Sequence, residues 1–284
     1  MKWLVTGAAG MLAQDVIAEA EARGHQVIAA TRADADLLDA PAIEALVKAE
    51  RPDVVVNCAA WTGVDAAEDH EAEAFAANAT GVQNLARAAR DIDAKLVHVS
   101  TDYVFDGKQE TPYAAEEPLN PLGAYGRTKA AGEWAAQSNC PNTYIVRTAW
   151  LYGAGGRCFP KTLARVLKET GSAKVVNDQH GQPTWTADVA RIIADLVNTA
   201  PPGIYHATSG GVTTWWGFTC EIASSIGVSP EVVEPIGSDA FPSPAPRPTW
   251  SALSHDTLVK SGVAPIGRWD ERWHEAAKAV LETP

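Results

Sequence analysis

The stretch KWLVTGAAGMLA, residues 2–13, combines an apolar run, a glycine turn and the start of a helix. Gly7 permits a tight turn after the strand, and Gly10 has no side chain, so a pyrophosphate can approach the backbone. Ala13 is small at the point where helix and strand pack closely. The helix N-terminus offers backbone amides and a partial positive charge to an anion. The stretch therefore predicts a dinucleotide-binding turn at the start of the chain.

The segments that follow repeat this alternation of strand and helix. Strands are expected at residues 27–30, 54–58, 96–99 and 144–148, and helices at residues 11–23, 42–50, 72–91 and 126–138. The Val-rich run 54–58 is continuous, as is typical of a strand buried on both faces. This order predicts an α/β fold with a doubly wound parallel sheet of the Rossmann type.

The second half is less regular and predicts a smaller mixed α/β lobe that binds the substrate. Helices are expected at 159–170 and 186–198, and strands at 174–176 and 203–207. We expect residues 1–150 to form the dinucleotide-binding domain, with 171–212 returning to it. Residues 151–170 and 213–284 are expected to form the substrate-binding lobe.

The composition is that of an ordinary globular protein, with 46% hydrophobic and 20% charged residues among 284. No run of about 18 uncharged apolar residues occurs, which argues against a membrane span. The formal charge of −12 disfavours nucleic acid, whose binding depends on phosphate neutralisation by Lys and Arg. The N-terminus carries no signal-peptide pattern and the four cysteines form no CxxC pair, so we expect a reduced, cytoplasmic protein.

The end of the second expected strand bears on the choice of cofactor. An acidic residue there would accept hydrogen bonds from a ribose 2′-hydroxyl, but the sequence has Thr31 and Arg32. Arg32 can pair with a 2′-phosphate, which favours NADPH, or it can simply be solvated. Asp36 and Leu37 follow closely and are expected to frame the adenine.

Tyr125 and Lys129 are the expected catalytic pair. They are four residues apart, so on a helix they lie on one face, one turn from each other. A nearby ammonium is expected to lower the pKa of the tyrosine, which would give its proton to an alkoxide as hydride reaches the carbonyl carbon.

Thr101 directly follows the buried strand 96–99, at the sheet edge where open α/β sheets bind ligands. It is expected to hydrogen-bond the same carbonyl oxygen, or alternatively to cap a turn. Asn78, inside the expected long helix, is either a packed polar residue or a group that steadies a water or a backbone bend.

The combination of Gly7-x-x-Gly10, Tyr125-x-x-x-Lys129 and Thr101 resembles the extended short-chain dehydrogenase/reductase superfamily. More narrowly, the chain resembles the dTDP-4-dehydrorhamnose reductase family. The segments that carry this resemblance are residues 57–68, 100–107, 147–153 and 178–184, and it extends to the region of residues 247–253.

The resemblance implies reduction of the C4 ketone of a dTDP-4-dehydro-6-deoxyhexose, chiefly dTDP-4-dehydro-L-rhamnose to dTDP-L-rhamnose. The hydride would come from NADPH, with NADH as an alternative, and Thr101, Tyr125 and Lys129 would form the catalytic triad. Some relatives use Mg²⁺ through glutamates at a dimer contact. Those glutamates cannot be matched here, so metal and oligomeric state, monomer or homodimer, stay open.

The resemblance also implies two sets of binding residues. Besides Tyr125 and Lys129, the cofactor would contact Gly7, Gly10, Met11, Leu12, Arg32, Asp36, Leu37, Ala59, Ala60 and Thr62. The nucleotide sugar would contact Thr62, Val64, Thr101, Asp102, Tyr103, Tyr125 and Trp150, with Gln179, Gln182 and Thr184 toward its nucleotide end. For Trp150, packing in the core is the alternative.

Several alternatives compete with this assignment. A dehydratase typically has an Asp-Glu pair after the threonine, whereas Asp102 is followed by Tyr103. A 4-epimerase is less easily excluded from chemistry, although the pocket segments do not resemble one. A related reductase of specialised metabolism, of the dihydrostreptose type, would act on a similar 4-keto sugar. A non-catalytic, NADP-binding regulatory subunit of methionine adenosyltransferase also resembles this family.

Overall fold

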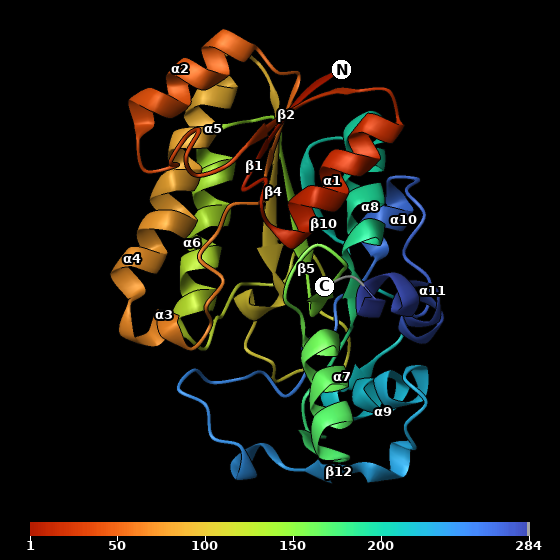
Figure 1. Ribbon diagram of the computed structural model, residues 1–284. Helices are drawn as coiled ribbons and strands as arrows, with labels where there is room; N and C mark the ends of the chain where they lie inside the picture. The colour runs from red at the N-terminus through yellow and green to blue at the C-terminus, as the bar shows by residue number, and fades with distance from the viewer. Residues whose placement is uncertain (283–284) are drawn as a thin grey trace.

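Six parallel strands form the central sheet of the protein, described by a computed structural model over residues 1–282 (Figure 1). Their order across the sheet is β10-β5-β4-β3-β1-β2. The strands are β1 (Lys2–Thr6), β2 (Gln26–Ala30), β3 (Val54–Asn57), β4 (Lys95–Thr101), β5 (Thr143–Thr148) and β10 (Gly203–His206). The order reverses between β1 and β3, which is the crossover of a doubly wound fold, so the expected fold class is confirmed.

Helices cover both faces of this sheet (Figure 1). One face carries α1 (Met11–Ala22) and α8 (Thr186–Thr199), and the other carries α2 (Ala40–Glu50), α5 (Gly81–Asp91) and α6 (Ala124–Asn139). Successive side chains of a strand point to opposite faces. Trp3 and Val5 accordingly pack with α1 and α8, whereas Leu4 packs with α2 and α5.

The expected long helix 72–91 is interrupted. It consists of α4 (Glu71–Phe75), a π-helical turn η1 (Ala76–Thr80) and α5, preceded by the short helix α3 (Ala66–Asp69). Asn78, in the π turn, accepts a hydrogen bond from the backbone N–H of Trp61 at 2.8 Å and donates to Thr128 Oγ1 at 3.0 Å. The widened turn thus directs the buried side-chain amide of Asn78 towards the first turns of α6. Turns of this kind are frequent at functional sites.

The smaller lobe is built on α7 (Phe159–Thr170), α9 (Trp215–Ser225) and α11 (Trp269–Glu282). Three two-stranded sheets surround them, pairing β7 (Ala173–Val176) with β12 (Val233–Ile236), β8 (His180–Gly181) with β11 (Thr213–Thr214), and β6 (Leu151–Tyr152) with β9 (Thr184–Trp185). The remaining short helices are η2 (Asp102–Val104), η3 (Pro230–Val232), η4 (Ser238–Ala240) and α10 (Asp256–Lys260).

Two segments pack with a different part of the molecule from the one that the expected domain division assigns to them. Residues 171–212 were expected to return to the large domain, as α8 and β10 do, but β7 pairs with β12 in the smaller lobe. In the opposite sense, Leu258 of α10 is packed in the core between α1, α8 and the central sheet. Both follow from long-range pairing, which the local pattern does not specify.

A buried ion pair joins α6 to the sheet. Arg147 of β5 donates from Nε and Nη2 to the two carboxylate oxygens of Glu133 on α6, at 2.9 and 2.7 Å. Ser100 of β4 donates to the same carboxylate. Arg147 also donates to the backbone oxygen of Ala115, and its guanidinium lies 5.1 Å from the Phe105 ring centroid. Both charged side chains are at most 2% exposed, so each depends on the other.

We expect Glu133→Ala to lower the free energy of unfolding by about 3–5 kcal/mol, because it leaves the Arg147 guanidinium buried without its counter-ion. Urea unfolding followed by circular dichroism measures this change. Glu44→Ala, which removes the exposed partner of Lys48, is the control and should leave the midpoint nearly unchanged. Equal midpoints for the two variants would contradict the role assigned to the buried pair.

Candidate active site

A cleft of about 1120 Å³ opens at the carboxyl ends of the central strands. Its walls come from the turns after β1, β2, β3, β4 and β5 and from the smaller lobe. The reversal of strand order next to β1 leads to this edge, which is where open α/β sheets bind ligands.

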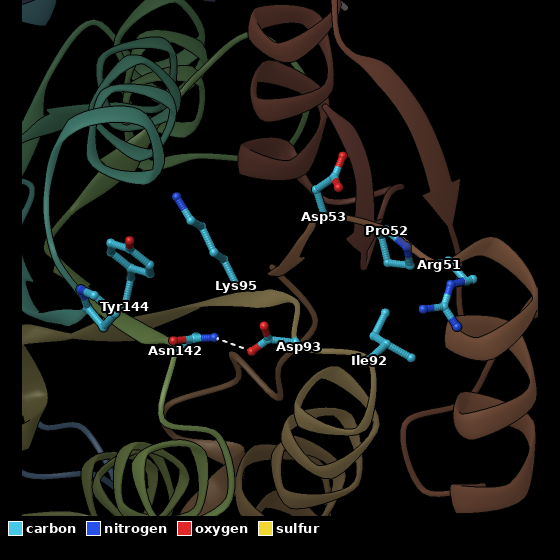
Figure 2. Close-up of a pocket in the computed structure, with 9 residues that line it drawn as sticks. Arg51, Pro52, Asp53, Ile92, Asp93, Lys95, Asn142 and Tyr144 are labelled. Atoms are coloured by element: carbon cyan, nitrogen blue, oxygen red, sulfur yellow. Dashed lines mark hydrogen bonds between the residues drawn. The ribbon is translucent and has the colours of Figure 1, made fainter.

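A second hollow, of about 650 Å³, lies at the amino ends of the central strands (Figure 2). Several of its polar side chains bond within the protein. Asn142 donates to Asp93 at 2.9 Å, Tyr144 donates to the backbone oxygen of Ala200, and Lys95 donates to that of Val197. The chemistry-bearing residues predicted from the sequence are absent from the lining of this hollow.

The glycine turn after β1 forms the floor of the cleft. Gly7 has φ +68°, and a Cβ placed on it would lie 2.7 Å from the backbone nitrogen of Ala59. Gly10 precedes α1 in an extended conformation, with no side-chain cap on the helix N-terminus. The first amides of α1 are therefore available to an anion, which is the arrangement that a dinucleotide pyrophosphate requires.

The residues expected near the adenine and its ribose lie at one end of the cleft. Arg32 is exposed and pairs with Asp36, with 3.0 Å between Nε and Oδ2. Leu37 is buried beside them, and all three line the cleft. The Asp36 carboxylate accepts from Arg32 through Oδ2 and from the backbone N–H of Leu38 through Oδ1.

Tyr125 and Lys129 both face the cleft from the first turns of α6. The helix approaches its neighbours closely, since a Cβ on Gly126 would lie 2.2 Å from the Tyr103 backbone oxygen. Lys129 Nζ donates to the backbone oxygen of Val99 at 2.6 Å. The spacing seen in the sequence therefore does bring the phenol and the amine to the same cavity.

Thr101, the last residue of β4, completes this group. Its hydroxyl donates to Asp102 Oδ1 at 2.9 Å and accepts from the backbone N–H of Tyr103 at 3.2 Å. The turn-cap interpretation of Thr101 is thus correct for this structure, and the residue also lines the cleft beside Tyr125. One hydroxyl can serve both purposes, because it rotates freely about its Cβ–Oγ bond.

The acid–base properties of the pair differ from the sequence expectation. Burial raises the pKa of Tyr125 to about 12, the negative charge of Asp102 adds to the increase, and a hydrogen bond from Thr101 opposes it. Burial lowers the pKa of Lys129 to about 8, against the opposing charges of Glu133 and Cys58. The expected lowering of the Tyr125 pKa is therefore wrong, because desolvation of the phenolate dominates.

The residues expected to contact the sugar divide into two groups. Thr62, Val64, Asp102, Tyr103 and Trp150 all line the cleft. Ala59 and Ala60, expected at the cofactor, line it as well, as do Met11 and Leu12.

Gln179, Gln182 and Thr184 do not line the cleft. Gln182 is buried, accepting from the backbone N–H of Leu253 and the hydroxyl of Thr208, both at 2.8 Å. Thr184 is fully buried and accepts from the backbone N–H of Ser209. Gln179 donates to Ser238 at 2.9 Å. Each of these side chains bonds another loop of the protein, and their contact with a nucleotide stays a prediction.

Trp215 and Arg157 are among the cleft residues that were not anticipated. Trp215, the first residue of α9, lies against Trp150 in the wall of the cleft. Arg157 is an exposed cation in the cleft, on the loop after β6, where Gly155 accepts a hydrogen bond from Gln14 of α1. The glycines at 153–156 and the tandem Trp215-Trp216 were the available signals, but neither motif has a spacing that points to one partner.

Metal and membrane features can be examined over residues 1–282. In that range no group of three or more His, Cys, Asp and Glu side chains is arranged to hold a metal ion. None of the helices there is both long enough and apolar enough to serve as a membrane span.

Comparison with known proteins adds to this geometry. Residues 1–282 match the family model described as the RmlD substrate binding domain. A dTDP-4-dehydrorhamnose reductase of Streptomyces griseus is 46% identical, over 98% of this chain and 94% of its own. A dTDP-4-keto-6-deoxy-D-glucose reductase of Streptomyces niveus is 43% identical, over 94% and 93%. The crystal structure of the Bacillus anthracis dTDP-4-dehydrorhamnose reductase in complex with NADP is 33% identical, with a TM-score of 0.94 and coverage of 97% and 98%.

The buried carboxyl group of Asp102 provides a test of the site's electrostatics. Burial raises its pKa from 3.8 to about 6, although hydrogen bonds from Ser251 and Thr101 oppose the shift. The folded protein therefore holds this proton more tightly than the unfolded chain does. The stabilisation that results is complete below about pH 4 and is lost as the pH rises through about 6.

We expect Asp102→Asn to remove this dependence, so that the variant gains stability relative to the parent as the pH rises. The gain between about pH 4 and neutral pH should approach 3 kcal/mol, the equivalent of a shift of about two pKa units. Urea unfolding of both proteins across this range gives the difference. A difference that stays constant with pH would show that Asp102 titrates normally.

Proposed function

This chain belongs to the dTDP-4-dehydrorhamnose reductase family, and from that premise we propose that it reduces the C4 ketone of a dTDP-4-dehydro-6-deoxyhexose with NAD(P)H. The observation that carries the proposal is the meeting of Thr101, Tyr125 and Lys129 with the dinucleotide turn in one cleft. The enzyme is an oxidoreductase that acts on a CH–OH group.

The cleft suits a dinucleotide on physical grounds. The turn is tight because a Cβ on Gly7 would meet the backbone of Ala59 and one on Gly10 would lie 3.1 Å from the Gly7 oxygen, and the α1 N-terminus beside it has no side-chain cap. The bound cofactor supplies a hydride to the carbonyl carbon. Lys129 is positioned to hydrogen-bond a ribose hydroxyl as well as the Val99 backbone oxygen, since an ammonium has three donors.

Tyr125 acts as the proton donor. As hydride adds to carbon, the carbonyl oxygen becomes an alkoxide and takes the proton of the Tyr125 hydroxyl, so that ketone, hydride and proton together give the alcohol. The raised pKa of Tyr125 keeps the phenol protonated and ready to donate at neutral pH. Thr101 would donate to the same oxygen by turning its single hydroxyl proton away from Asp102. The Lys129 ammonium, charged below about pH 8, stabilises the phenolate that remains.

The substrate proposed is dTDP-4-dehydro-L-rhamnose, which would give dTDP-L-rhamnose. The alternative is a related 4-keto-6-deoxy sugar, because the Streptomyces niveus relative is named for dTDP-4-keto-6-deoxy-D-glucose. The test is incubation of the purified protein with NADPH and each keto sugar separately, with the product identified by NMR. Reduction of the glucose-derived sugar alone would favour the alternative, and reduction of neither would contradict the proposal.

Three other properties stay predictions: the cytoplasmic location, the oligomeric state and the need for Mg²⁺. A regulatory subunit that does not turn over is not favoured by relatives that are named as reductases. Cytoplasmic location, the choice between monomer and homodimer, and any need for Mg²⁺ each require an experiment.

We expect Tyr125→Phe to retain the fold and NADPH binding but to lose about 10²–10⁴-fold in turnover, because one proton donor is removed. Steady-state rates, with the cofactor titrated by fluorescence, measure both properties. Arg127→Ala is the control, since Arg127 lies two residues further along α6 and pairs with Glu71 at the surface. Near-normal turnover by folded Tyr125→Phe would refute the assigned role.

We expect NADPH to be used at least as well as NADH, because Arg32 stands where an acid would select the ribose hydroxyl. Arg32→Ala should reduce the ratio of kcat/KM for NADPH to that for NADH by about tenfold, the loss of one charge-assisted hydrogen bond at an exposed position. An unchanged ratio would mean that Arg32 is solvated and does not read the phosphate.

A further inference from the structure

Two tryptophans form a parallel stack in the wall of the cleft. The ring centroids of Trp150 and Trp215 are 3.6 Å apart, with 8° between the ring planes. Both side chains line the cleft and are half-buried. Trp150 follows β5 of the central sheet, whereas Trp215 begins α9 of the smaller lobe, so the stack joins the two parts of the molecule at the cleft.

Trp150 has an unusual backbone conformation that other contacts must maintain. Its φ is +45°, in the left-handed region that bulky L residues rarely adopt. Its backbone oxygen accepts from the N–H of Thr184 at 3.2 Å. A Cβ on Gly181 would lie 2.5 Å from the Trp150 ring, so the indole contacts backbone there. Strained residues of this kind cluster at functional sites.

Trp215 is held more firmly than Trp150. It packs in the hydrophobic core of the smaller lobe, and the Phe159 ring lies 4.4 Å from its own ring at an angle of 49°. Thr214, the residue before it, caps α9 by accepting from the N–H of Gly217 at 3.0 Å. The ring of Trp215 is thus held by the start of α9 and by an aromatic neighbour, and it stacks on Trp150 at the cleft.

We propose that Trp215 is a positioning residue for the sugar: it fixes the indole of Trp150 as a platform for the apolar face of a deoxyhexose ring. The proposal rests on the proposed function, since it names the part of the substrate that the platform receives. A stacked aromatic pair is stabilising beyond the effect of its buried area. That contribution offsets the backbone strain of Trp150 and keeps one ring orientation populated before the sugar arrives.

The neighbouring tryptophan supplies a matched control. Trp216 is also half-buried on α9, but its Nε1 donates to the backbone oxygen of Val233 at 2.9 Å and it does not line the cleft. Replacing Trp216 perturbs the smaller lobe to a similar extent without touching the stack. Trp215→Phe, which keeps an aromatic ring at the position, serves as the conservative variant.

The experiment compares Trp215→Leu, Trp215→Phe and Trp216→Leu in binding of dTDP-L-rhamnose, dTDP and NADPH by calorimetry, and in KM for the keto sugar. We expect Trp215→Leu to weaken dTDP-L-rhamnose binding and raise KM by about 3–10-fold, with dTDP and NADPH affinities unchanged. Trp215→Phe should restore most of the loss. Weakened binding of all three ligands, or an equal effect of Trp216→Leu, would overturn the proposal in favour of general disruption of the lobe.

Two further measurements separate an action through Trp150 from a direct one. Closely stacked indoles give a coupled circular-dichroism signal, which should disappear in Trp215→Leu and in Trp150→Ala but persist in Trp216→Leu. In a Trp150→Ala background, Trp215→Leu should produce no additional loss of dTDP-L-rhamnose binding. Additive losses would overturn the positioning role.

If the wild-type protein reduces neither keto sugar, the proposed function has failed, whereas a reductase unaffected by Trp215→Leu refutes this inference alone.

Discussion

The ion pair between Glu133 and Arg147 is the constraint on which the active site depends. It lies out of solvent beneath the cleft and ties α6 to β5, while the hydroxyl of Ser100 ties the same carboxylate to β4. Burying two charges is costly, and the cost is met only when each is fully hydrogen-bonded. Glu133 lies one helical turn beyond Lys129 and two turns beyond Tyr125 on α6. The ion pair therefore fixes the position of α6 along the sheet, and with it the position of Lys129 and Tyr125 relative to Thr101 at the end of β4.

The same helix shows how burial adjusts the chemistry of the site. The amine of Lys129 and the phenol of Tyr125 are both buried away from solvent. Burial lowers the pKa of Lys129 and raises the pKa of Tyr125, and each shift favours the neutral form of the group. A neutral phenol is the form that donates a proton, so burial keeps Tyr125 in the form that reduction of a ketone requires. The carboxylate of Glu133 partly offsets the penalty on Lys129, and thereby couples the structural ion pair to the catalytic amine.

Charge distribution explains how an acidic protein can receive anionic ligands. The chain has a formal charge of −12, yet in the cleft lining the cations Arg32, Lys129 and Arg157 balance the carboxyl groups of Asp36, Glu73 and Asp102, and the amides of α1 are uncapped. Inside a cleft these local groups outweigh the more distant surface charge, which salt screens. The hollow at the amino edge of the strands differs, because several of its polar groups are bonded to one another or to backbone.

Local pattern was sufficient for much of this protein. The apolar run and glycine turn at residues 2–13, the alternating strands and helices, and the spacing of Tyr125 and Lys129 all depend on neighbours within a few residues, so they were predictable from the sequence. The π turn at Asn78, the framework use of Gln182 and the Trp150–Trp215 stack depend on partners far along the chain. Periodicity carries no record of such partners, and desolvation, which set the pKa of Tyr125, exists only once the chain has folded around it.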